Sequence, residues 1–230
     1  MSSSEAQTGH LDYDLAYRGE SELGEQMPWD IRWPQPAYVE LAKAGRITGT
    51  VLDCGCGTGE IALYLAGIGY DVIGLDLAPT AISRAQAKAK ERGLDVTFAV
   101  ADALDLSGYE GRFDTVVDSG MAHVFGAEEL PLYAAALHRV CRPQGLVHVL
   151  GIDERRAFES QLTETVSQLD TEEPEPGERP LPMISAEALR GAFANGWAVE
   201  SIDETIMQAQ LPFSGDPVDV PALLARIRRR

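Results

Sequence analysis

The chain has 230 residues, 45% of them hydrophobic, which is enough to bury the core of one globular domain. Its formal net charge of −17 argues against a nucleic-acid partner, because phosphate contacts need clustered lysines and arginines. No apolar run is long enough to span a membrane and the first residues lack a signal-peptide pattern, so we expect a cytoplasmic protein. We expect it to be a monomer or a homodimer.

Residues 1–45 precede the first predicted strand. They begin with an acidic, weakly patterned stretch that nevertheless carries Tyr13 and Tyr17, and disordered leaders are usually poor in aromatic residues. A helix is predicted from Pro34 to Gly45. We interpret this segment as a partly helical N-terminal cap that closes over the rest of the domain.

From residue 50 to residue 152, strand and helix patterns alternate. Helices are predicted at 57–69, at 80–93, and from residue 129 to a stop at Pro143 and Gly145. Strands are predicted at 50–54, 70–76, 95–102, 112–120 and 146–152. This alternation indicates an α/β fold, Rossmann-like and doubly wound, with a mostly parallel seven-stranded sheet and helices on both faces.

The pattern changes after residue 152. A helix at about 155–169 leads into an acidic, proline-rich stretch, so 153–184 is interpreted as an insertion on the substrate side, either a substrate lid or a tolerated surface loop. In 185–230, a helix starts after Ser185 as N-cap. Residues 197–204 and 205–213 are predicted as two strands around a tight turn, closing one sheet edge. The basic residues 226–230 are interpreted as a solvated helix end. Residues 1–230 are thus predicted to form one domain.

The segment VLDCGCGTGE, residues 51–60, follows a strand and opens a helix. Gly55, Gly57 and Gly59 allow positive φ angles and a close approach of a ligand to the backbone. Dinucleotide-binding folds use a similar turn, but the G-x-G-x-x-G spacing is absent here. Asp53 suits a cationic amino group better than a pyrophosphate, which a carboxylate repels.

Acidic residues also end the next two strands. Asp76 is placed to accept hydrogen bonds from ribose hydroxyls, and Asp102 is placed to accept one from an adenine amino group. Together with Asp53, these carboxylates lie at the carboxyl ends of neighbouring strands, which meet at one crevice of a parallel sheet.

The motifs VLDCGCGTGE, VIGLD, VAD, FDTVVDSG and LHRVCRPQGLVHVLG, in this order, resemble those of class I S-adenosylmethionine-dependent methyltransferases over residues 50–152. The resemblance implies that S-adenosyl-L-methionine is the cofactor. It assigns the methionine portion to Asp53 and the glycine turn, the ribose to Asp76, and adenine to Asp102. The cofactor contacts that it implies are Trp29, Asp53, Gly55, Cys56, Gly57, Gly59, Asp76, Leu77, Asp102, Ala103 and Asp118.

The segment MPWDIRWPQP, residues 27–36, resembles the PWD element of thiopurine and thiol/halide methyltransferases and of small bacterial heterocycle methyltransferases. In those families tryptophans of this element line the cavity, which implies the same for Trp29 and Trp33. The sequence departs from the family at Arg32 and Trp33, where a glycine is usual. Indole rings can stack on a planar ligand or on a sulfonium centre, although they can also simply pack the cap onto the core.

The segment after the fourth strand contains the candidate catalytic residue. His123 is the candidate general base, because an unshifted imidazole titrates near neutrality, although it can equally hold a backbone group. Substrate contacts are expected from Tyr13, Tyr17, Trp33, Ser119 and Met121, with helix packing as the alternative for the tyrosines. Methyl transfer depends largely on alignment, so a strong base is not required. No metal is expected, because Cys54 and Cys56 lack further ligands.

These observations predict transfer of a methyl group from S-adenosylmethionine to the oxygen or nitrogen of a small aromatic or heterocyclic molecule. One alternative is an S-methyltransferase acting on small thiols, and another is a non-catalytic S-adenosylmethionine-binding protein. A protein or RNA methyltransferase is disfavoured by the acidic charge and by the absence of an Asn-Pro-Pro-Tyr-like tetrapeptide. The expected partner is a small-molecule substrate, with neither nucleic acid nor membrane involved, in secondary metabolism or in detoxification.

Overall fold

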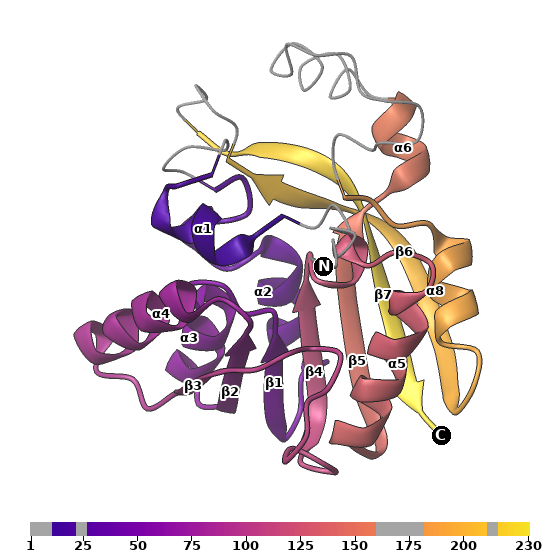
Figure 1. Ribbon diagram of the computed structural model, residues 1–230. Coiled ribbons are helices and arrows are strands. Elements are labelled where there is room, and N and C mark those ends of the chain that lie inside the picture. The colour runs from indigo at the N-terminus through magenta and orange to yellow at the C-terminus, as the bar shows by residue number, and fades with distance from the viewer. Residues whose placement is uncertain (1–10, 22–26, 160–181, 211–215) are drawn as a thin grey trace, which may run out of the picture.

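The structure is a computed structural model that describes residues 11–21, 27–159, 182–210 and 216–230. One sheet runs through the molecule in the strand order β3-β2-β1-β4-β5-β7-β6 (Figure 1). The strands are β1 (Thr50–Cys54), β2 (Asp71–Asp76), β3 (Thr97–Val100), β4 (Phe113–Ser119), β5 (Cys141–Ile152), β6 (Trp197–Ala209) and β7 (Val218–Arg229). Strands β1 to β5 are parallel, and β7 is antiparallel to both β5 and β6. The predicted mostly parallel, seven-stranded α/β sheet is confirmed.

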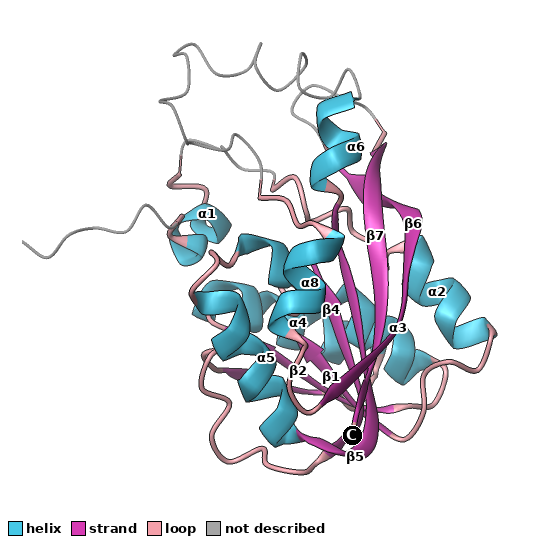
Figure 2. Cartoon of the chain, turned by 90° about the vertical axis from the view of Figure 1, so that its right-hand side faces the viewer, coloured by secondary structure: helices cyan, strands magenta, loops and turns pink. Residues whose placement is uncertain are grey.

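Helices cover both faces of this sheet (Figure 2). Residues of α5 (Glu129–Val140) and α8 (Ala186–Ala192) belong to one hydrophobic cluster with the sheet. Residues of α2 (Pro36–Lys43), α3 (Glu60–Gly67) and α4 (Pro79–Arg92) belong to the other. The short helices are α1 (Tyr13–Arg18), α6 (Glu154–Glu159) and the 3₁₀ turn η1 (Ala122–Val124). In the described part of the chain, no helix is long and apolar enough to cross a membrane.

Helix α1 belongs to the N-terminal segment and packs against the start of α4. The Asp14 carboxylate accepts a hydrogen bond from the Thr80 amide at 2.8 Å, in the first turn of α4. The Asp12 side chain caps α1 by accepting from the Leu15 amide, and Gly19 ends it in the left-handed region with φ 75°. The cap is therefore anchored beside the loop that joins β2 to α4.

The C-terminal part of the sheet differs from the prediction. Residues 197–209 form one strand rather than two strands around a turn, because the polar pair Asp203 and Glu204 lies exposed on an edge strand, where charged residues are common. The basic cluster at 226–230 is not a helix end: it lies on β7 up to Arg229, where Arg226 and Arg228 both pair with Glu200 of β6. The antiparallel pair at the sheet edge is therefore formed by β6 and β7.

Two helix boundaries also differ. Helix α5 ends at Val140 instead of at the predicted stop at Pro143 and Gly145, because Cys141 already pairs with Phe113 of β4. The helix predicted at about 155–169 is described only as α6, since 160–181 lie outside the described residues. Ser185 caps α8 as predicted, accepting a hydrogen bond from the Ala188 amide at 3.1 Å.

Candidate functional site

The glycine-rich turn joins β1 to α3, and its backbone requires glycine. Gly55, Gly57 and Gly59 have φ angles of 71°, 53° and 86°, in the left-handed region that other residues rarely adopt. A Cβ atom at Gly57 would lie 2.6 Å from the Tyr17 hydroxyl, and one at Gly55 would lie 2.7 Å from the sulfur of Met121. Two segments far apart in the sequence thus contact this turn directly.

Two predicted carboxylates hold the turn in place. Asp53 is 1% exposed and accepts a hydrogen bond from the Ala62 amide of α3 at 3.0 Å, and burial raises its pKa to about 7. Asp76 accepts from the Gly57 amide at 2.8 Å and from the Ala78 amide at 2.9 Å, and burial raises its pKa. A carboxylate has about four lone-pair sites, so Asp76 keeps acceptor capacity for a ligand.

The residues expected around adenine lie farther along the same sheet edge. Asp102 is exposed and accepts a hydrogen bond from the Leu104 amide at 2.8 Å. Leu77 is 61% exposed, whereas Ala103 belongs to the buried core. Leu77 and Asp102 follow the ends of β2 and β3, which pair side by side.

A cavity beside the glycine turn gathers most of the predicted methionine-side and substrate-side residues. Its volume is about 70 Å³. Its lining includes the predicted residues Tyr17, Trp29, Trp33, Asp53, Gly55, Cys56, Gly57 and Ser119. The other predicted site residues do not line it: Tyr13, Gly59, Asp76, Leu77, Asp102, Ala103, Asp118, Met121 and His123. Ligand pockets usually measure roughly 300–1,000 Å³, so the cap lies closed against the turn.

Three aromatic residues of the cap form this closure. The Trp29 indole N–H donates to the Tyr17 hydroxyl at 2.8 Å. Tyr13 and Tyr17 both pack edge-on against Trp29, with ring centroids 5.6 and 6.2 Å away. Burial, with Asp76 nearby, raises the pKa of Tyr13 to about 12 and that of Tyr17 well above its usual value. Both hydroxyls therefore stay protonated near neutral pH, and that of Tyr17 accepts the hydrogen bond from Trp29.

Arg32, which stands where the family usually has glycine, has a left-handed backbone conformation. Arg32 has a φ of 68°, a conformation that glycine adopts without strain, so the usual glycine and this arginine occupy the same type of position. The Arg32 amide donates to the Asp30 carboxylate at 3.3 Å. The adjacent Trp33 is 44% exposed and lies on the cavity wall.

Asp118 lies in the core behind the site. Its carboxylate accepts hydrogen bonds from the Met121 amide at 2.8 Å, the Ala122 amide at 3.0 Å and the Tyr133 hydroxyl at 2.8 Å. It is 0% exposed, and burial raises its pKa to about 7. Its contacts fix the turn that carries Met121 and His123.

His123 does not have the properties expected of a general base. Its Nδ1 accepts a hydrogen bond from the Ile152 amide at 3.2 Å, so the proton of the neutral ring is on Nε2. Burial lowers its pKa to about 4, which contradicts the premise of titration near neutrality. The ring can donate a hydrogen bond from Nε2, which lies on the side of Gly120.

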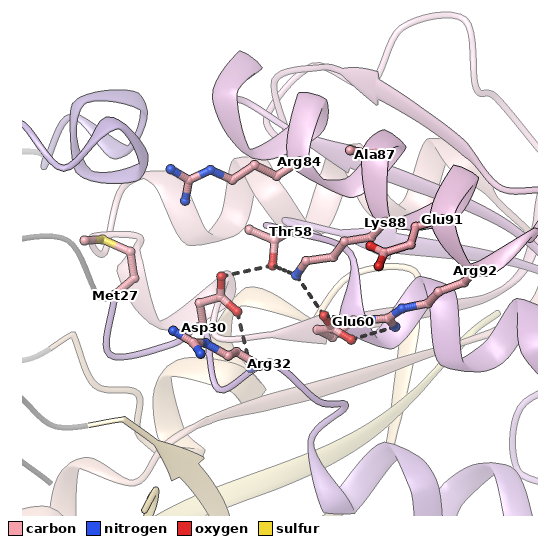
Figure 3. Close-up of a pocket in the computed structure, with 10 residues that line it drawn as sticks. All are labelled: Met27, Asp30, Arg32, Thr58, Glu60, Arg84, Ala87, Lys88, Glu91 and Arg92. Atoms are coloured by element: carbon pink, nitrogen blue, oxygen red, sulfur yellow. Dashed lines mark hydrogen bonds and ion pairs between the residues drawn. The ribbon is translucent and has the colours of Figure 1, made fainter. Parts of the chain in front are cut away.

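A larger cavity of about 510 Å³ lies between the 27–32 segment and α4 (Figure 3). Its lining contains none of the predicted site residues. A chain of polar contacts crosses it: Asp30 accepts from the Thr58 hydroxyl at 3.1 Å, Lys88 donates to Thr58 and to Glu60 at 2.7 Å each, and Arg92 pairs with Glu60 at 2.9 Å. These contacts tie the PWD segment to the glycine turn. Because the larger cavity contains none of the predicted site residues, the smaller cavity is the better candidate site.

Some residues of the site were not identified from the sequence. Gln35 is 4% exposed and lines the smaller cavity, yet nothing in the sequence marks a glutamine before a helix as buried. Asp30 and Thr58 were part of quoted motifs, but their contact with each other is not local in sequence. Among the described residues, no group of three His, Cys, Asp or Glu side chains is arranged to hold a metal ion.

Comparisons with known proteins agree with this geometry. Residues 51–145 match the methyltransferase domain family. The 2-heptyl-1-hydroxyquinolin-4(1H)-one methyltransferase of Mycobacteroides abscessus is 36% identical over 200 residues, which cover 86% of this chain and 81% of that protein.

Two solved structures resemble this chain to different degrees. One, described under the conversion of a disulfide bond into a thioacetal group during echinomycin biosynthesis, is 54% identical, with a TM-score of 0.85 and coverage of 94% of this chain and 90% of that one. Magnesium protoporphyrin IX methyltransferase from Synechocystis, with 18% identity, a TM-score of 0.61 and coverage of 84% and 80%, shares the fold. The chain belongs to the class I S-adenosylmethionine-dependent methyltransferases, and to their small-molecule type.

Proposed function

We propose that this methyltransferase acts on a sulfur atom of a disulfide-bridged small molecule. The observation that carries the proposal is the 54% identity, over 94% of the chain, to a protein whose structure concerns conversion of a disulfide bond into a thioacetal group. The hydroxyquinolinone methyltransferase is 36% identical over 86% of the chain. The sulfur acceptor therefore replaces the oxygen or nitrogen acceptor as the first choice.

The residues present fit the cofactor. Gly55 and Gly57 present bare backbone to the smaller cavity, and Asp53 lines the same cavity with an acceptor for an amino group. Asp76, bonded to the Gly57 amide, keeps acceptor capacity for ribose hydroxyls. When bound, S-adenosylmethionine supplies an electrophilic methyl group and leaves as S-adenosylhomocysteine. We assign the methionine end to Asp53 and the turn, the ribose to Asp76, and adenine to the Asp102 region.

The acceptor chemistry supports sulfur. A disulfide sulfur forms the new bond to carbon with a lone pair and has no proton to lose, whereas a hydroxyl must also give up its proton. His123, the expected base, has a pKa lowered to about 4 and carries its proton on Nε2. Tyr13 and Tyr17 are held in their protonated form. These residues suit a reaction driven by alignment and by exclusion of water rather than by proton removal.

The walls of the smaller cavity define the proposed roles. Tyr17 lies over Gly57 and accepts a hydrogen bond from Trp29, and we assign to this pair the exclusion of water from the cofactor side. Trp33 and Ser119 line the same cavity, and we assign them to the acceptor side. An indole ring offers a flat apolar surface to an aromatic group of the acceptor and a favourable face to a developing sulfonium.

A second candidate acceptor is the hydroxyl of a hydroxyquinolinone-like heterocycle. It is supported by the 36% identical relative. Such an acceptor needs little help from a base if its hydroxyl is already acidic, which is compatible with the same site.

The test uses the purified full chain with methyl-labelled S-adenosylmethionine. Three acceptors are compared: a disulfide-bridged cyclic peptide carrying planar aromatic groups, the same peptide reduced to its dithiol, and 2-heptyl-1-hydroxyquinolin-4(1H)-one. We expect the label on a sulfur of the bridged peptide, located by fragmentation in the mass spectrometer. Label on the hydroxyquinolinone and none on the bridged peptide overturns the proposal, and so does label on the free dithiol alone.

A further inference from the structure

We infer that Gln35 is a positioning residue that joins the acceptor wall of the site to the edge strand β6. The inference rests on the proposed function for the assignment of Trp33 to the acceptor side. It goes beyond that function by naming the contact that sets where Trp33 stands. We call the contacts between residues 28–35 and the end of β6 the amide clamp.

The centre of the amide clamp is a pair of hydrogen bonds between one side chain and one backbone. The Gln35 Nε2 donates to the Gln208 carbonyl at 2.7 Å, and the Gln208 amide donates to the Gln35 Oε1 at 2.8 Å. A carboxamide offers the same donor and acceptor as a peptide group, so Gln35 binds β6 as a neighbouring strand would. Because Gln35 is 4% exposed, either group left unpaired would be costly.

Further contacts fix the rest of the segment to the same place. The Trp33 indole N–H donates to the Gln208 Oε1 at 3.0 Å, and the Gln208 Nε2 donates to the Asp219 carboxylate of β7 at 3.1 Å. The Gln210 amide donates to the Pro28 carbonyl at 2.7 Å. The segment is thus held at its start, at its end and through the Trp33 indole.

The amide clamp acts on one side of the site. Of the segment 31–35, Ile31, Trp33 and Gln35 line the cavity, and Ser119 at the end of β4 lines it too. Immediately after Gln35, α2 begins and is fixed to β4, where the Tyr38 hydroxyl donates to the Asp118 carbonyl. The wall therefore stands between two anchored points, and its distance from Ser119 depends on the clamp.

The cofactor side has its own anchors. Asp53 accepts a hydrogen bond from α3, and Asp76 accepts hydrogen bonds from the glycine turn and from the residue before α4. None of these bonds involves Gln208. Loss of the amide clamp should therefore change acceptor binding while leaving binding of S-adenosylhomocysteine near that of the wild type.

The test compares Gln35→Met, which keeps the side-chain length and removes both hydrogen bonds, with Gln86→Met. Gln86 is a matched control, because it lies on α4, away from the acceptor wall, and its Nε2 donates to the Phe98 carbonyl of β3 at 3.1 Å. We expect Gln35→Met to raise the acceptor KM about tenfold with less than about twofold change in the dissociation constant of S-adenosylhomocysteine. The control should leave both values unchanged.

The second readout does not need an acceptor. Fluorescence spectra of the wild type and of Gln35→Met, each with and without Trp33→Phe, isolate the emission of Trp33 by difference. We expect Trp33 emission in Gln35→Met to shift to longer wavelength and to be quenched more by acrylamide. Gln35→Asn keeps the carboxamide but is one methylene too short to make both bonds to the Gln208 backbone. It should produce the same fluorescence change and replaces Gln35→Met if that variant does not fold.

The outcomes separate the two proposals. Unchanged Trp33 emission in both variants overturns the amide clamp, whichever acceptor is methylated. A loss of S-adenosylhomocysteine affinity as large as the change in acceptor KM also overturns it, because the effect is then a general loss of structure. Failure of every disulfide acceptor overturns the proposed function and leaves the fluorescence test in force.

Discussion

Asp76 connects the ribose position to the glycine turn, and replacing it with asparagine tests both roles. The two carboxylate oxygens accept from the Gly57 amide at 2.8 Å and from the Ala78 amide at 2.9 Å. Asparagine keeps one acceptor oxygen and places an NH₂ group against the other backbone N–H. One charge-assisted hydrogen bond is lost, at about 1.5–3 kcal/mol, so either the Gly57 amide of the glycine turn or the Ala78 amide loses its acceptor.

We expect Asp76→Asn to weaken binding of S-adenosylhomocysteine by about 10- to 100-fold, measured by isothermal titration calorimetry. Asp71→Asn is the matched control, since Asp71 is exposed at the opposite end of the same strand and accepts a hydrogen bond from the Thr50 hydroxyl at 3.3 Å. Its affinity should equal that of the wild type. Equal affinities for wild type and Asp76→Asn would refute both the ribose assignment and the role of this carboxylate in the turn.

Two further predictions concern titration. Because burial lowers the pKa of His123 to about 4, a plot of kcat against pH should show no inflection near the ordinary imidazole value of 6.5. His123→Gln should lower kcat by far less than the ~10²–10⁴-fold expected for a lost general base. A wild-type inflection that this variant abolishes would contradict the prediction. Burial raises the pKa of Asp118 from 3.8 to about 7, so the stability that its protonation provides is present below about pH 4 and lost as the pH rises through 7. Between pH 4 and pH 7 the free energy of unfolding of Asp118→Asn should therefore fall less than that of the wild type, the difference being at most about 4 kcal/mol. Urea unfolding at a series of pH values measures this, and the same pH dependence in both proteins counts against the buried-carboxylate explanation.

The core of the fold could be predicted because its signals are local. The strand and helix patterns between residues 50 and 140 are separated by glycines and capping positions, and right-handed βαβ units allow few arrangements. The carboxylates Asp53 and Asp76 fall at strand ends, so the sequence alone places them at one edge of the sheet. Their hydrogen bonds to Ala62 and Gly57 follow from that placement.

The C-terminal hairpin could not be predicted in the same way, because its register depends on contacts between distant residues. Arg226 and Arg228 resemble a solvated tail until Glu200, on the neighbouring strand, is seen to pair with both. Gln35 gives no sequence signal, since its partner is the backbone of Gln208. The altered pKa of His123 likewise depends on burial, which a single histidine in a sequence does not reveal.

Strand β7 lies between β5 and β6, so among the described strands β6 reaches the sheet only through β7, although β6 comes earlier in the chain. Pairings such as Ile152 with Ala222 close long loops, and such pairings form slowly because chain entropy is lost before the contacts are gained. Strand β1 pairs with β4 across a similarly long stretch, as Val51 with Thr115 shows. The acceptor wall needs one closure more, so we expect a refolding chain to discriminate between acceptors only when the hairpin has docked and Gln208 meets Gln35.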